Sequence, residues 1–137
     1  MRAILSLLLI FLTVSATVAS DQEDAAADAV VSAFAQARQA AHLPKLERMG
    51  RNKFREKVCN RDMRFASGII RNVVYETSDP TQMPESAQRL ATWPDAYEVA
   101  ARFGVGVCLL NDGGQPKFSV LIATYESPWN SFLRFFD

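Results

Sequence analysis

Few residues in this sequence have side chains that could carry out chemistry near neutral pH. The chain has one histidine, His42, and two cysteines, Cys59 and Cys108. Histidine provides most proton-transfer groups and many metal ligands at that pH, so a single histidine restricts both kinds of site. A nucleophilic Cys–His pair that includes His42 is conceivable, but it requires a free thiol.

Asp95 and Glu98 form the carboxylate pair considered for acid–base catalysis, although surface charge beside a helix explains the same pair. The sequence contains no Gly-x-Ser-x-Gly, His-Glu-x-x-His, Ser-x-x-Lys or Gly-x-x-x-x-Gly-Lys motif. Gly104 and Gly106 lack the third glycine of a dinucleotide loop. We therefore assign no catalytic, cofactor-binding or metal-binding residue, and we expect neither a cofactor nor a catalytic metal.

Residues 1–20 have the layout of a secretory signal peptide. Arg2 precedes an apolar run from Ile4 to Leu12, and small residues dominate from Val14 to Ser20. The apolar run is short for a hydrocarbon core of about 30 Å, which favours a cleaved signal over a retained membrane anchor. We predict a signal peptide over 1–20, one mature domain over 21–137 without an integral membrane span, and a secreted or periplasmic location.

Export favours a disulfide between Cys59 and Cys108, because cysteines of exported proteins are commonly paired. Two independent buried thiols are the alternative. The bond would close a loop of about 50 residues and stabilise the fold by about 4 kcal/mol in the chain-entropy estimate. It would also consume both thiols that a Cys–His nucleophile needs.

The chain of 137 residues has equal numbers of basic and acidic residues, 15 of each, and so lacks a global positive field for nucleic acid. Basic residues nevertheless concentrate between Lys45 and Arg64. The functional interpretation of this segment is a face for anionic lipid headgroups or acidic envelope polymers, and the ordinary one is a solvated helix face. Few aromatic residues are interleaved with it, which argues against stacking on nucleic-acid bases.

Hydrophobic spacing and turn residues divide the mature chain into short elements. They predict helices over 21–41, 45–59 and 85–93, a strand over 69–75, a further helical turn within 95–102, and strands over 103–110 and 117–125 around a six-residue loop. Leu43 and Pro44 end the first helix. Leu90 and Trp93 are expected to be buried together.

The strand over 117–125 is apolar on both faces, so both faces must be covered. In its partner strand, Gly104, Gly106 and Cys108 share one face and leave room for a helix to approach closely. These patterns predict an α+β domain: a three-layer α-β-α sandwich whose helix-covered sheet includes a C-terminal antiparallel hairpin. We expect the aromatic tail over 127–136 to cover the sheet edge or to be partly disordered, with an exposed partner or membrane patch as the alternative.

Three segments in order, Ala33–Leu46, Phe103–Val107 and Phe118–Thr124, resemble the CAP superfamily. That superfamily comprises cysteine-rich secretory proteins, antigen 5, pathogenesis-related 1 proteins and bacterial SCP-like relatives. The first segment resembles the family's first helix and its Gly-Leu-Pro-x-Leu-like turn, with His42 in place of glycine. The other two resemble its Val-Gly-Val-Gly-like strand and the last strand paired with it. The resemblance implies an α-β-α sandwich.

The resemblance does not extend to the cleft of typical CAP proteins, which holds two histidines and two acidic residues. His42 lies in the turn instead, and the basic stretch Arg48–Lys57 stands where the family has a histidine-containing second helix. We therefore predict a degenerate, non-catalytic CAP-like module that binds an amphiphile or another envelope component. An exported carboxylate-dependent hydrolase of unrecognised type is the alternative, and a polar cleft in place of an apolar groove would distinguish it.

We predict that the exported protein begins at Ser20 or Asp21, because Ala19 and Ser20 both suit the cleavage enzyme's preference for small residues. Intact mass and N-terminal sequencing of the product from an exporting host will measure this. A product that still begins at Met1 would refute the signal peptide.

Overall fold

The computed structural model describes residues 2–50, 52–62, 64, 69–93, 100–110 and 114–126, with side chains from residue 20 onward except at 52 and 53. In chain order the elements are α1 (Arg2–Ala40), β1 (Glu47–Arg48), α2 (Asn52–Cys59), β2 (Ile69–Thr77), α3 (Glu85–Ala91), β3 (Ala100–Leu110) and β4 (Lys117–Glu126). The predicted α+β class is confirmed.

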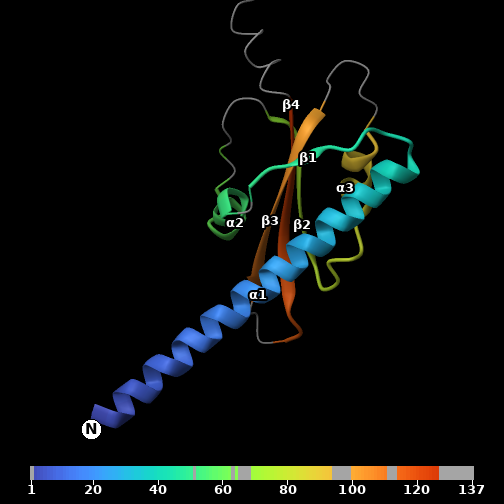
Figure 1. Cartoon of the computed structure of the whole chain (residues 1–137). Helices are drawn as coiled ribbons and strands as arrows, with labels where there is room; N and C mark the ends of the chain where they lie inside the picture. Colours follow the sequence, from blue (N-terminus) through green and yellow to red (C-terminus); the bar gives the residue numbers. More distant parts are fainter. Residues whose placement is uncertain are drawn as a thin grey trace, which may run out of the picture.

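The strands form one open mixed sheet in the order β1-β3-β4-β2 (Figure 1). β3 and β4 pair antiparallel from Ala100 opposite Glu126 to Leu110 opposite Lys117, which confirms the predicted hairpin. β2 pairs antiparallel with the other side of β4, and the short β1 runs parallel to β3. β1 and β2 are therefore the two edges of the described sheet.

α1 and α3 pack on one face of this sheet. Phe103, Val105 and Val107, at alternate positions of β3, share a buried core with Val30 and Phe34 of α1. The same core contains Ala26, Ala27, Leu46, Ala87, Leu90, Ala91, Phe118, Val120 and Ile122. The contribution of α1 recurs every three to four residues, as expected for a helix with one apolar stripe.

α2 packs on the opposite face, where β3 carries its glycines. A Cβ atom on Gly104 would overlap the ring of Phe54, and one on Gly106 would overlap the backbone carbonyl of Phe54. The predicted close approach of a helix is therefore confirmed. The aromatic ring of Phe54 lies edge-on to that of Tyr125, with centroids 5.9 Å apart.

The cover on this second face is partial among the described residues. α2 has eight residues, and its buried side chains Phe54 and Val58 lie over Leu121 and Ala123 of β4. On the neighbouring strand β2, Val74 is 45% exposed. The complete three-layer sandwich therefore stays a prediction.

Cys59, at the end of α2, and Cys108, in β3, form a disulfide with their Cα atoms 5.2 Å apart. The predicted pairing is confirmed, and neither cysteine is free. The bond joins α2 to the same face of β3 against which Phe54 packs.

The predicted helix over 45–59 is wrong in its first part. Residues 47–48 run along β3 as β1, and the Met49 N–H donates to the Phe103 carbonyl at 2.8 Å. Pro44 and Gly50 flank this segment, and both disfavour a continuous helix. α2 consequently begins only at Asn52.

Two expectations near Trp93 are also corrected. Leu90 is buried, but Trp93 is 42% exposed, and the Arg71 guanidinium lies 3.7 Å from the ring centroid of Trp93. This cation–π contact explains how a large ring remains at the surface. Residues 100–102 pair with β4 as strand and form no helical turn. Residues 94–99 and the aromatic tail over 127–136 lie outside the described residues.

α1 includes both the predicted signal peptide and the predicted first helix of the mature domain. Its N-terminal half extends away from the sheet in Figure 1, and its first buried side chain among those described is that of Glu23. Within the residues whose side chains are described, no helix has the length and apolar character to span a membrane. Signal cleavage and export stay predictions.

The Phe54 contact predicts that Gly106→Ala destabilises the domain by about 3 kcal/mol, since a backbone carbonyl cannot move aside as a side chain can. Urea unfolding followed by circular dichroism will measure this. The control is Gly50→Ala, where an added Cβ has no described neighbour within 4 Å. Equal stability of the two variants would contradict the close packing.

Candidate functional site

Two regions combine charged side chains with a defined environment. One surrounds the buried carboxylate of Glu23, next to the disulfide. The other is a groove between the second half of α1 and the segment 43–48 that returns to the sheet.

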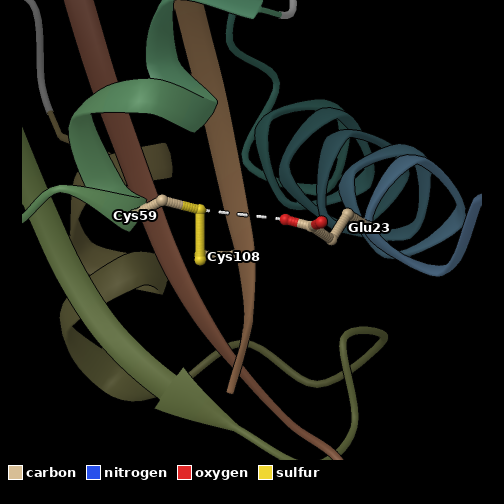
Figure 2. Close-up of side chains that lie close together, drawn as sticks. All are labelled: Glu23, Cys59 and Cys108. Carbon is tan, nitrogen blue, oxygen red and sulfur yellow. Dashed lines mark hydrogen bonds between the residues drawn. A yellow bond between two sulfur atoms is a disulfide. The ribbon is translucent and has the colours of Figure 1, made fainter. Parts of the chain in front are cut away.

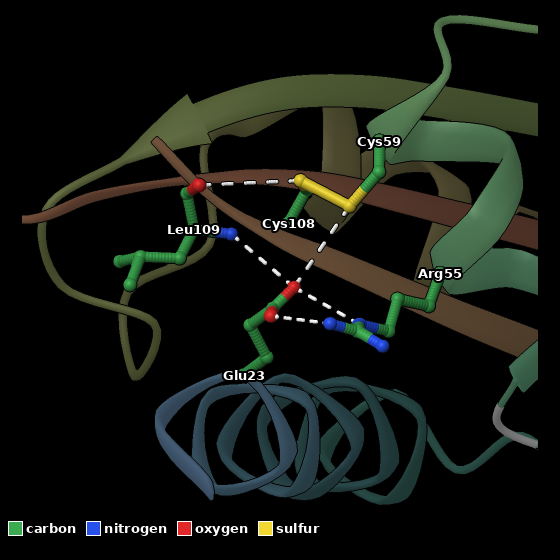
Figure 3. A network of polar contacts seen from close by, with 5 residues as sticks. All are labelled: Glu23, Arg55, Cys59, Cys108 and Leu109. Atoms are coloured by element: carbon green, nitrogen blue, oxygen red, sulfur yellow. Dashed lines mark hydrogen bonds and ion pairs between the residues drawn. A yellow bond between two sulfur atoms is a disulfide. The ribbon is translucent and has the colours of Figure 1, made fainter. Parts of the chain in front are cut away.

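Glu23 is 5% exposed and accepts hydrogen bonds from two other elements (Figure 3). Arg55 of α2 donates to both carboxylate oxygens, from Nε at 3.2 Å and from Nη2 at 2.9 Å. The backbone N–H of Leu109 in β3 donates at 3.4 Å. One carboxylate thus connects α1, α2 and β3.

The pKa of Arg55 is raised above its ordinary value. The larger cause is its hydrogen bonding to Glu23, and the second is the negative charge of that carboxylate. Arg55 is therefore a guanidinium cation at neutral pH. Because both partners are charged and the geometry is bidentate, these are the strong kind of hydrogen bond.

Glu23, Cys59 and Cys108 each bring a potential metal-ligand atom within 4.8 Å of the others (Figure 2). The two sulfur atoms are bonded to each other, so neither provides the thiolate that a metal or a nucleophilic mechanism requires. The Cys–His pair considered with His42 is excluded for the same reason. In the disulfide-bonded protein this cluster is a structural connection.

The groove beside α1 has a volume of about 980 Å³ and a largely apolar wall. Val31 and Ala35 of α1 line one side and Leu46 lines the other. At its base the rings of Phe34 and Phe103 stack with centroids 4.7 Å apart. The groove therefore ends against the buried core of the domain.

A Schellman turn at the end of α1 forms one end of the groove. The His42 N–H donates to the Gln39 carbonyl at 3.0 Å, and the Leu43 N–H donates to the Arg38 carbonyl at 2.9 Å. His42 has a φ of 58°, the left-handed conformation that such turns usually assign to glycine. The turn, with Pro44 after it, reverses the chain toward β1.

Basic side chains border the groove. Arg38 is buried and holds the turn in place, with Nε donating to the Pro44 carbonyl at 2.8 Å and Nη1 donating to the Ala91 carbonyl at 3.1 Å. Arg48 forms an ion pair with Asp28 at 3.0 Å. His42 and Lys45 are exposed at the rim, where the one acidic lining residue is Glu47.

Several arginines of the basic segment 45–64 are paired with carboxylates in the part of it that the structure describes. Arg55 pairs with Glu23 and Arg64 pairs with Asp62. Hydrogen bonds from Arg64 lower the pKa of Asp62 to about 2. Part of the positive charge of this segment is therefore neutralised by ion pairs, whereas Lys45 borders the groove.

The carboxylates that a hydrolase would need are not brought together among the described residues. Asp95 and Glu98, the predicted pair, lie outside them. Glu47 is exposed and has no second carboxylate beside it in the groove lining.

Sequence reasoning missed Glu23 and Arg38 as structural residues. Both lie on the apolar stripe of α1, at helical spacing from Val30 and Phe34. A charged residue on such a stripe indicates a buried charge with partners from other elements.

Comparisons of the chain with protein-family models, with characterised proteins and with solved structures find no significant match. The function must therefore be argued from the geometry of the two regions described above.

Replacing Glu23 with alanine is expected to destabilise the domain by about 2–3 kcal/mol, because it leaves the Leu109 N–H without its acceptor and Arg55 without its partner. Glu23→Gln, which keeps an acceptor oxygen, should cost about half as much. Thermal and urea unfolding will measure both.

The matched control is Glu85→Ala in α3, where the Glu85–Arg89 pair is exposed at the surface. We expect a loss below about 0.5 kcal/mol for this variant. A similar effect of Glu23→Ala and Glu85→Ala would show that the Glu23 network contributes little.

Proposed function

We propose that this chain is an exported, non-catalytic binding module that holds a single-chain anionic amphiphile in the groove beside α1. The observation that carries the proposal is the combination of an apolar wall and a basic rim in one groove. An acyl chain needs the first and an anionic headgroup needs the second.

The size of the groove suits such a ligand. Its volume of about 980 Å³ is at the upper end of the range typical of small-molecule sites. Burial of an acyl chain against Val31, Ala35 and Leu46 would contribute about 0.8 kcal/mol for each methylene group removed from water.

The rim provides charge where a headgroup would lie. Lys45 is exposed and forms no ion pair with a described residue, so its ammonium is available to a carboxylate or phosphate. Arg48, although paired with Asp28, adds a second positive charge beside it. Lys45 and Arg48 belong to the return segment, so the turn after α1 sets their distance from the apolar wall.

We also propose that the domain is a degenerate CAP-like α-β-α sandwich. The reversal at His42, Leu43 and Pro44 and the close approach of Phe54 to the Gly104 strand support this assignment. The Cys59–Cys108 disulfide supports export, since such bonds persist in oxidising compartments. Among the described residues, the groove lining includes one carboxylate, that of Glu47, and therefore offers no carboxylate pair for the hydrolase alternative.

Displacement of a fluorescent fatty acid by undecanoate from the mature protein tests the function. Ala35→Trp places a bulky ring in the groove and should weaken binding at least about tenfold, whereas Gln36→Trp, exposed on another side of α1, should leave it unchanged. Equal affinities of these two variants, or no saturable binding by the parent protein, would contradict the proposed site.

A second pair of variants tests the contact between Lys45 and the headgroup. Lys45→Glu should weaken undecanoate binding about tenfold but leave binding of methyl undecanoate unchanged, because only the anion uses the ammonium. The control is Lys117→Glu, which reverses an exposed charge at the start of β4, outside the groove lining. It should change the affinity for neither the acid nor the ester. Identical behaviour of acid and ester would show that the rim does not select anions.

A further inference from the structure

β2 is a long edge strand of the described sheet. It has nine residues and, among the described elements, pairs only with β4, which leaves about 30 Å of backbone edge without a strand partner. It contains no proline, and its one register irregularity with β4 lies at the Ile69 end. The stretch from Asn72 to Thr77 is therefore a regular template for a further strand.

The face of β2 that is turned toward α2 is only partly covered by the described residues. A cavity of about 880 Å³ lies between β2 and the end of α2, and its lining comprises Asn72–Glu76, residues at the end of α2, Cys108 and Leu110 of β3, and Ser119 of β4. Because β3 and β4 contribute to this lining, the cavity lies over the α2 face of the sheet, next to β2. Val74, in the middle of this stretch, is one of the two exposed large hydrophobic residues of the described chain.

The side chains of β2 match a second copy of β2 in one register. A two-fold axis perpendicular to the sheet reverses the strand direction and keeps each face, so residues facing the same side are placed opposite one another. With Val74 on the axis, Val74 faces its own copy, Asn72 faces Glu76, and Val73 faces Tyr75. Each Asn72 amide can then donate to a Glu76 carboxylate, twice in the dimer.

The neighbouring registers are poorer. An axis at Val73 would place Val74 opposite Asn72 and Glu76 opposite Ile70. An axis at Tyr75 would place Val74 opposite Glu76. An axis at Glu76 would place two carboxylates opposite each other, which is unfavourable. The register with Val74 on the axis is therefore the one that pairs apolar side chains with each other and hydrogen-bond donors with acceptors.

We propose that the chain forms a symmetric dimer through antiparallel pairing of β2 with β2 of a second copy, with Val74 on the two-fold axis. The sheet then continues through both copies. A single strand pair lies at the small end of specific interfaces, so we expect dissociation in the range of about 10 µM. The amphiphile groove lies by β1, at the opposite edge of the sheet. Experiments on the dimer and on the ligand site therefore test the two proposals independently.

Cysteine cross-linking tests the register. Val74→Cys should give a covalent dimer under mild oxidation, with peptide mapping that links the two substituted positions and leaves Cys59–Cys108 intact. Asn72→Cys and Glu76→Cys should each stay largely monomeric alone and form a covalent dimer when mixed. Equal cross-linking of all three variants alone, or no enrichment in the mixture, would overturn the register.

Sedimentation equilibrium of the mature protein tests the association without a new cysteine. We expect a concentration-dependent dimer, which Val74→Asp should weaken at least about tenfold by placing two carboxylates on the axis. Gln88→Asp, exposed on α3, should leave it unchanged. A monomer at about 100 µM, or equal association of both variants, would overturn the dimer.

Discussion

The close approach of α2 to β3 is the constraint on which the rest of the structure depends. Gly104 and Gly106 allow Phe54 to lie directly on the strand, and the disulfide fixes the end of the same helix there. Arg55, one residue after Phe54, then points to α1 and meets the Glu23 carboxylate. One short helix thereby connects the two faces of the sheet.

This connection positions α1, and α1 forms the groove. With Glu23 held at one end and the buried Arg38 bonded to Pro44 and Ala91 at the other, α1 is fixed across the sheet at both ends of its packed part. The return segment must then cross to the β1 edge, and the space between it and α1 is the groove. If the predicted signal is cleaved at Ser20, Glu23 lies in the first turn of the mature helix and prevents that turn from fraying.

Most of the fold was predictable where a local pattern decides the outcome. The two apolar faces of β4, the glycines of β3 and the hairpin loop indicated the sheet and the helix packed on it, and the predicted export indicated the disulfide. The parallel pairing of β1 was not predictable, because two residues carry no periodicity and their partner is distant in sequence. An apolar groove was expected, but its position was not predictable, since its wall and rim come from segments that only the tertiary fold brings together.

The most direct test of the account is a titration of ¹⁵N-labelled mature protein with undecanoate at constant protein concentration, followed by amide chemical shifts. We predict saturable shifts at Val31, Ala35, Lys45 and Leu46, with one common affinity, and unchanged shifts along Asn72–Glu76 of β2. Shifts concentrated on β2, or no saturable shift in the groove, would contradict the claim that this groove is the binding site.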